Sequence, residues 1–99
     1  MTIKFERPDR HVEGLLATAE LRFSGGPLDG MRLIGFSVWE SRRGGVLVTM
    51  PARQYSIQGE RRSFALFRAI DNPEAEERVK ALIAEEYVRW DRVNPRELV

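Results

Sequence analysis

The chain has 99 residues, of which 42% are hydrophobic and 31% charged, and its formal net charge is +1. This length suits one domain with a single modest core, and the balance of apolar and charged residues argues against a disordered chain. The absence of cysteine excludes a disulfide framework, and no apolar run is long enough for a membrane span or a signal peptide. We therefore expect one cytoplasmic domain over residues 1–99, with its core at about 2–90, a short tail at 91–99 and no membrane contact.

Most of the chain before residue 70 carries the period-two alternation of apolar and polar residues that is typical of half-buried strands. The alternation predicts strands at 2–7, 14–23, 31–40, 46–50 and, last, 62–70. Glycine-rich segments at 24–30 and 41–45 predict hairpin loops. Pro51 ends the fourth strand, because proline has no amide hydrogen for the sheet, and we expect residues 52–60 to be a polar excursion.

The same alternation predicts which side chains of the two long strands share a face. In the strand at 14–23, the apolar residues at odd positions, from Leu15 to Phe23, are expected on one face, and Leu16 on the other. In the strand at 31–40, Ile34, Phe36 and Val38 share a face, and Leu33, Ser37 and Trp39 are expected on the opposite one.

The last element is predicted to be an amphipathic helix. Asp71 or Asn72 can cap its start, Pro73 suits the first turn, and the helix region ends at the Asn94–Pro95 pair. Its apolar residues follow the spacing of one buried face: Ala75, Val79, Leu82, Ile83, Tyr87 and Trp90. We expect Phe36, Leu82 and Tyr87 in the core. Strands followed by a helix predict the α+β class: an antiparallel β-meander of about four to five strands with one C-terminal helix packed on it.

Charge is distributed unevenly along the chain. Residues 32–68 hold seven arginines against two glutamates, whereas residues 73–91 hold three basic side chains against six acidic ones. A molecule with a basic middle and an acidic helix can steer phosphate groups to one side.

Three segments resemble one known family. Residues 45–53 read GVLVTMPAR, residues 59–70 read GERRSFALFRAI, and residues 81–87 read ALIAEEY. Over roughly residues 2–90 the chain is similar to the SpoVG family, the stage V sporulation protein G or septation regulators of bacteria. The resemblance implies a small α+β homodimer that binds DNA or RNA and regulates gene expression, with links to sporulation or septation in some bacteria.

The candidate nucleic-acid-binding residues are basic side chains in turns and in the polar excursion. They are Arg42, Arg43, Arg53, Arg61 and Arg62, to which the family resemblance adds Arg78 and Lys80 on the helix. Arginine forks pair with phosphate oxygens, and Trp39 and Tyr55 are candidates for stacking on unpaired bases. The alternative is that these arginines form a solvated rim, with Trp39 under the helix or in a dimer seam.

The sequence offers little for catalysis or for metal binding. His11 is the single histidine and follows a turn without a clear partner, and no glycine-rich segment has the spacing of a phosphate loop. We therefore expect no enzyme, no catalytic residues, no cofactor, no metal and no small-molecule substrate. The rival to a nucleic-acid-binding protein is a protein-interaction module that uses a sheet edge and the basic rim without binding nucleic acid.

Overall fold

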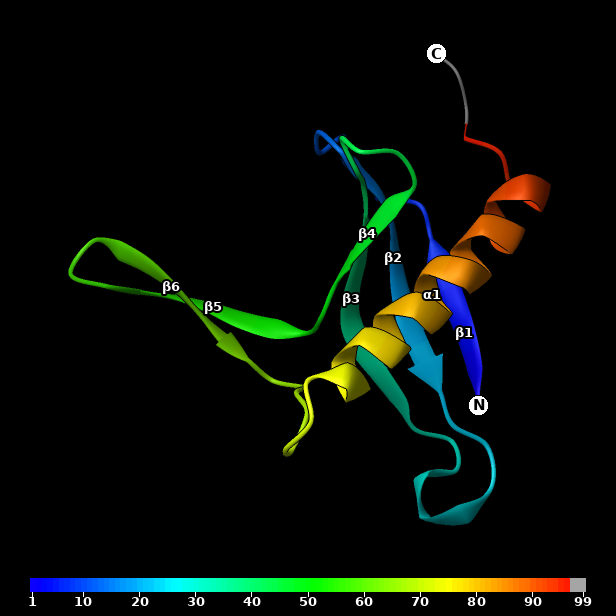
Figure 1. Cartoon of the computed structure of the whole chain (residues 1–99), viewed down its shortest axis with the longest axis horizontal. Helices are drawn as coiled ribbons and strands as arrows, with labels where there is room; N and C mark the ends of the chain where they lie inside the picture. The colour runs from blue at the N-terminus through cyan, green and yellow to red at the C-terminus, as the bar shows by residue number, and fades with distance from the viewer. Residues whose placement is uncertain (97–99) are drawn as a thin grey trace.

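A computed structural model describes residues 1–96 and shows two sheets and one long helix (Figure 1). The larger sheet is antiparallel, in the order β1 (Thr2–Glu6), β2 (Leu15–Arg22), β3 (Arg32–Glu40) and β4 (Val46–Thr49). A separate antiparallel hairpin follows, made of β5 (Ala52–Ile57) and β6 (Glu60–Ala65), and the chain ends in α1 (Glu74–Val93). A short 3-10 helix, η1 (Gly26–Leu28), lies in the β2–β3 loop. The predicted α+β class is confirmed.

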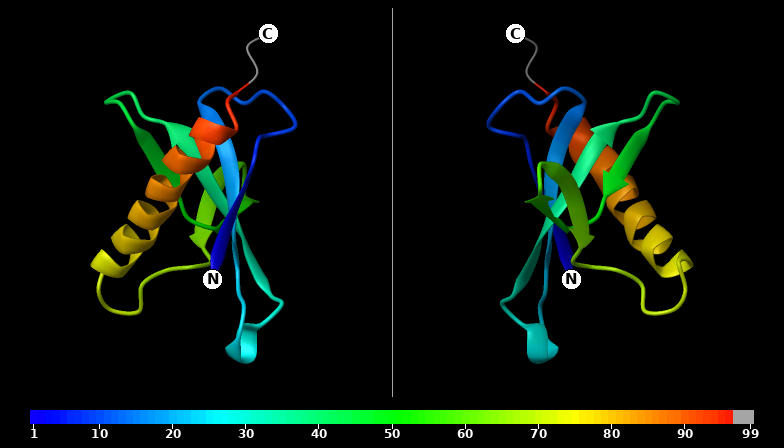
Figure 2. Two further views of the ribbon diagram at one scale, coloured as in Figure 1. Left: turned by 90° about the vertical axis from the view of Figure 1, so that its right-hand side faces the viewer. Right: turned by 90° about the vertical axis from the view of Figure 1, so that its left-hand side faces the viewer.

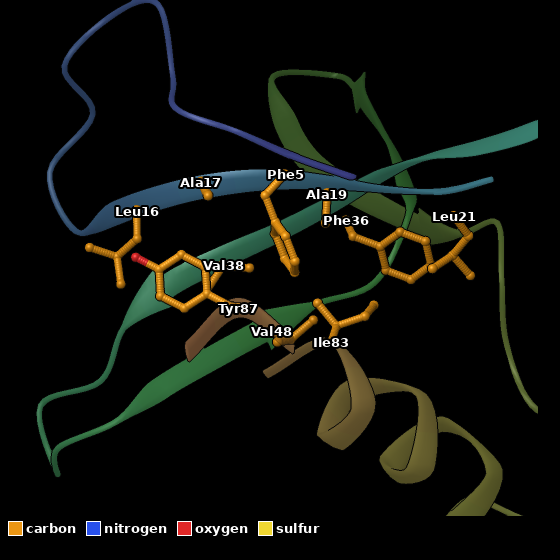
Figure 3. Close-up of a cluster of buried hydrophobic side chains, with 10 residues drawn as sticks. All are labelled: Phe5, Leu16, Ala17, Ala19, Leu21, Phe36, Val38, Val48, Ile83 and Tyr87. Atoms are coloured by element: carbon orange, nitrogen blue, oxygen red, sulfur yellow. The ribbon is translucent and has the colours of Figure 1, made fainter. Parts of the chain in front are cut away.

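The helix and the larger sheet form two layers (Figure 2). One face of the sheet packs against α1, and the opposite face carries no helix from residues 1–96. Between the layers lies a core of ten buried side chains, of which Phe36, Val38 and Ile83 are the largest fully buried ones (Figure 3). Ile83 and Tyr87 are the buried residues of the helix, as its spacing predicts. Leu82 was expected in the core but is 38% exposed, because the buried stripe of the helix is centred on its neighbour Ile83.

Two irregularities in the β2–β3 pairing change the predicted faces. Leu15 pairs with Trp39 and Ala17 with Val38, so Leu16 is an extra residue in β2, and its side chain is buried instead of facing away from the core. Ala19 pairs with Phe36 and Leu21 with Leu33, so β3 also carries one extra residue there.

The extra residue in β3 moves Ile34 out of the core. Ile34 was expected on the face of Phe36, but its side chain is 61% exposed, and Leu33 packs against the core instead. Gly35 makes this bulge possible with a φ of 108°, and a Cβ atom on Gly35 would lie only 3.1 Å from Cβ of Pro51. Pro51 therefore lies directly against the bulge, where the chain leaves the sheet.

Residues 52–60 are not the polar excursion that the sequence predicts. They form β5, the connecting turn and the first residue of β6, and the predicted last strand at 62–70 begins at Glu60 and ends at Ala65. Phe67, beyond β6, returns to the body of the protein and packs edge-on against Phe36, with ring centroids 6.0 Å apart.

Both ends of α1 are held by side chains. The backbone N–H of Glu74 donates to Oδ1 of Asn72 at 3.0 Å. At the other end, Arg7 donates to Oδ1 of Asp91 at 2.6 Å and to the Tyr87 hydroxyl at 3.0 Å, and its guanidinium lies 4.4 Å from the Trp90 ring centroid. The helix thus continues to Val93, beyond the start of the expected tail at residue 91, and residues 97–99 of that tail lie outside the described part. Within residues 1–96, no helix combines the length and the apolar character that a membrane crossing requires.

Candidate nucleic-acid interface

The β5–β6 hairpin projects from the body of the protein, and all twelve of its strand residues are exposed (Figure 1). Arg53 pairs with Phe64, and Tyr55 pairs with Arg62. Residues that lie directly opposite in an antiparallel pair share a face, as do residues two apart in one strand. The four side chains therefore lie on one face of the ribbon, which we call the aromatic–arginine face and define as Arg53, Tyr55, Arg62 and Phe64. The pair of Ile57 and Glu60 continues the same face towards the turn. Tyr55 is 38% and Phe64 56% exposed, so both rings are accessible.

The opposite face of the hairpin is polar and carries a single charge among its paired residues. Gln54 pairs with Ser63, and its Nε2 donates to Oγ of Ser63 at 3.2 Å. Ser56 pairs with Arg61. The structure thus separates two arginines that are neighbours in sequence, because Arg61 and Arg62 extend from opposite faces of the ribbon.

Local features of the sequence explain why this hairpin forms. Gln58 and Gly59 connect the strands and have positive φ values of 51° and 82°, as a tight two-residue hairpin turn with glycine in second place requires. At the other end, the N–H of Leu66 donates to the carbonyl of Pro51 at 3.0 Å and closes the base of the ribbon.

The candidate arginines do not form one continuous surface. Arg42 and Arg43 lie in the exposed β3–β4 turn, which precedes β4, whereas the hairpin follows β4 and leaves from its other end (Figure 1). Arg78 is exposed on α1, and Lys80 lies 3.6 Å from a carboxylate oxygen of Glu77 on the same helix. The seven basic candidates therefore belong to three separate places.

Ion pairing distinguishes the candidate arginines from others on the surface. Arg62 pairs with Glu60 at 3.0 Å, but no carboxylate among residues 1–96 lies within 4.0 Å of Arg42, Arg43, Arg53 or Arg61. Arg22 and Arg32, near the β2–β3 loop, are both paired with a carboxylate. The hydrogen bond from Arg22 lowers the pKa of Glu20, and Arg32 binds the same carboxylate from the other side. The guanidinium groups of Arg22 and Arg32 are thus already engaged, and so is that of Arg62, whereas those of Arg42, Arg43, Arg53 and Arg61 have no carboxylate partner among residues 1–96.

Trp39 lies on the face of the sheet that carries no helix, since its neighbours Phe36 and Val38 are buried on the other face. Its indole N–H donates to Oγ1 of Thr49 at 3.0 Å. It lines an open hollow of about 860 Å³, together with Arg42 from the β3–β4 turn. The alternative position for Trp39, under the helix, is therefore wrong, and the structure brings one candidate stacking residue beside one candidate arginine.

Sequence reasoning did not select Phe64, although it completes the aromatic–arginine face. The sequence predicts a polar excursion at 52–60 in place of β5, and therefore gives Phe64 no cross-strand partner there. The Gln58–Gly59 turn between two short alternating stretches was the available signal.

Within the described part of the chain, no three histidine, aspartate or glutamate side chains are arranged to hold a metal ion. The chain matches no protein-family model, and neither curated proteins nor solved structures provide a match. The protein is thus an α+β protein with a projecting β-ribbon, and one face of this ribbon combines arginine and aromatic side chains.

Proposed function

We propose that this protein is a nucleic-acid-binding regulator of gene expression, similar to the SpoVG family and acting in the cytoplasm. The observation that carries the proposal is the aromatic–arginine face, where Arg53 and Arg62 alternate with Tyr55 and Phe64 on an exposed ribbon. The similarity to septation and sporulation regulators supports a role in one of those processes.

The chemistry of this face suits DNA or RNA. A guanidinium group forms two parallel hydrogen bonds to phosphate oxygens, and an exposed aromatic ring stacks on a base with about 1–3 kcal/mol per contact. Arg53 has no carboxylate partner in the described chain, and Arg62 has only the exposed pair with Glu60. Such an exposed pair contributes little, so phosphate can replace the carboxylate at small cost.

The remaining basic residues are assigned a secondary role. Arg42, Arg43 and Arg61 lie on other surfaces, where they raise the local potential for a polyanion and increase the rate of encounter. Arg78 and Lys80 are surrounded by the acidic side chains of the first helical turns, which weakens their attraction for phosphate.

Fluorescence anisotropy with labelled single- and double-stranded DNA and RNA at about 50 and about 200 mM salt tests the proposal. The Arg53→Ala/Arg62→Ala variant is expected to bind more weakly and to reduce the slope of log K against log salt by about 1.4–1.8, the equivalent of two lost phosphate contacts. The matched control is Arg89→Ala/Arg92→Ala, which removes the same charge from the far end of the helix. Equal losses in both variants would show that only net charge matters and would refute the proposed face.

The proposal includes a homodimer. Strands β1 and β4 form the two edges of the larger sheet, and a free edge can add a strand from a second copy. Sedimentation equilibrium distinguishes an 11.4 kDa monomer from a species of twice that mass. A monomer at all micromolar concentrations contradicts this part of the proposal.

The second candidate function is a protein-interaction module that does not bind nucleic acid. Its supporting observation is the apolar surface on the hairpin, where Ile57 is 49% exposed and Phe64 56% exposed. An isolated two-stranded hairpin is at best marginally stable in water, so a protein partner covering this surface would also stabilise it. The absence of binding to every nucleic-acid probe at low salt favours this candidate.

A further inference from the structure

A second surface with its own chemistry lies at the end of the sheet where the β1–β2 connection meets the β3–β4 turn. The N–H of Glu40 donates to the carbonyl of Gly14 at 2.7 Å and joins the two segments. Between them lies the open hollow of about 860 Å³ that Trp39 lines. We call it the Trp39 hollow; the side chains that matter here are those of Glu13, Trp39, Arg42, Leu47 and Thr49.

An aromatic ring in a fixed orientation lines the hollow. The bond from the indole N–H to Thr49 restrains the ring of Trp39, and the cross-strand neighbour Leu47 adds an apolar side chain that is 57% exposed. A Cβ atom on Gly14 would lie 3.9 Å from Cε3 of the ring, so any larger residue there would begin to cover the ring on that side. Glycine at this position, where φ is 81°, keeps the ring open.

Charged groups of both signs line the same hollow. Arg42 provides a positive charge, and Glu13 provides a negative charge. Both side chains are exposed, and neither forms a hydrogen bond or an ion pair with another residue of the described chain. A phosphate group prefers an excess of positive charge, which this hollow lacks, and Arg42 repels a simple cation. A flat, neutral ligand with both donors and acceptors on its edge fits this set of groups.

We infer that the Trp39 hollow binds one unpaired nucleobase that carries an exocyclic amino group, as cytosine and adenine do. The inference rests on the proposed nucleic-acid-binding function and names the part of the ligand that this hollow selects. The base stacks on Trp39, its amino group donates to the carboxylate of Glu13, and Arg42 donates to a ring acceptor. Thymine and uracil lack the amino donor, and a base inside a duplex has both its faces and its pairing edge occupied.

Anisotropy with short oligo(dC), oligo(dT) and a duplex of equal length tests the inference. The native protein is expected to bind oligo(dC) more tightly than oligo(dT). The Glu13→Gln variant is expected to lose most of this preference, because a neutral amide accepts the amino hydrogen less strongly. The matched control, Asp71→Asn, removes one exposed carboxylate elsewhere and is expected to keep the preference. Equal affinity of the native protein for oligo(dC) and oligo(dT) overturns the inference.

Substitution of Trp39 provides a second, independent measurement. Trp39→Ala is expected to weaken oligo(dC) binding about 5- to 160-fold, the equivalent of one lost stacking contact, and to leave duplex binding unchanged. Trp39→Phe retains a ring and is expected to retain most of the affinity, which keeps the test valid if the alanine variant folds poorly. Unchanged oligo(dC) binding by Trp39→Ala, or strongly weakened duplex binding by Trp39→Phe, overturns the inference.

The two proposals fail separately. If the Arg53→Ala/Arg62→Ala variant loses affinity but the native protein shows no preference for oligo(dC), the hollow is wrong and the hairpin stands. If the preference for oligo(dC) depends on Trp39 while the Arg53→Ala/Arg62→Ala variant binds normally, base binding in the Trp39 hollow is supported and phosphate binding by the aromatic–arginine face is refuted.

Discussion

Two neighbouring aliphatic residues of α1 provide a direct test of how the helix packs. Ile83 is fully buried, whereas Leu82 is 38% exposed. Both side chains lose three carbon atoms on substitution by alanine, so Ile83→Ala and Leu82→Ala are chemically matched and differ in burial. The helical period separates them by about 100° around the axis, which makes their costs sensitive to the orientation of the helix.

The expected magnitudes follow from burial. Three buried carbon groups at about 0.8 kcal/mol each contribute about 2.4 kcal/mol, and the cavity left at a fully enclosed site adds to this, so Ile83→Ala is expected to cost about 3–4 kcal/mol. Only part of this transfer free energy applies to Leu82, and solvent can fill the space. We expect Leu82→Ala to cost about 1.5 kcal/mol at most.

Urea unfolding followed by far-ultraviolet circular dichroism measures both free energies of unfolding. The two variants are expected to share the m-value of the native protein and to differ in their midpoints. Losses that are equal, or larger for Leu82→Ala, would show that the buried stripe is centred one residue earlier and would refute the packing described here.

Two further predictions concern the bulge and the helix end. Gly35→Ala is expected to destabilise the fold by about 1–3 kcal/mol, because the new Cβ atom meets Pro51 at 3.1 Å and the φ of 108° is strained for a side chain; an unchanged urea midpoint would contradict this. The hydrogen bond from Arg7 lowers the pKa of Asp91 in the folded protein, so the ionised carboxylate stabilises the fold at neutral pH. This contribution to the free energy of unfolding is expected to be lost as the pH falls from about 3.9, the pKa of aspartate in an unfolded chain, towards the lower pKa of the folded protein. The Asp91→Asn variant is expected to be less stable than the native protein at neutral pH and to lose less stability on acidification. Acid-unfolding curves that run parallel for the two proteins would contradict this.

The strands and the helix were predictable because their signals are local. The strand at 14–23 and the helix face through Ile83 and Tyr87 follow from periodicity alone, and the structure has both. The two bulges were not predictable, because an extra residue is defined only by what the partner strand does. Leu16 and Ile34 were assigned to the wrong faces for this reason, since period-two reasoning assumes that the alternation is never interrupted.

The candidate site was predicted in its residue types and missed in its arrangement. The sequence places Arg53, Tyr55 and Arg62 in one basic segment. They share a face because of the register between β5 and β6, which the sequence does not give. Arg42 and Arg43 lie apart from the hairpin residues because β4 separates the two segments, and sequence spacing does not reveal the direction of β4. The Trp39 hollow was missed because Glu13 and Gly14 are distant in sequence from Glu40 and meet it only through the β2–β3 pairing.

The positions of the two proposed surfaces follow from the same local features that shape the fold. The Gly35 bulge and Pro51 direct the chain away from the sheet, so the hairpin becomes a separate ribbon instead of a fifth sheet strand. The aromatic–arginine face therefore follows the end of β4, whereas the Trp39 hollow lies along β4 and the β3–β4 turn, and a nucleic-acid strand that contacted both would gain from a high effective concentration at the second site. The acidic start of α1, with three glutamates in its first turn, lies on the other layer and repels phosphate. This arrangement explains why Arg53 and Arg62 on the hairpin and Arg42 at the hollow, rather than Arg78 and Lys80 on the helix, are the residues on which binding is expected to depend.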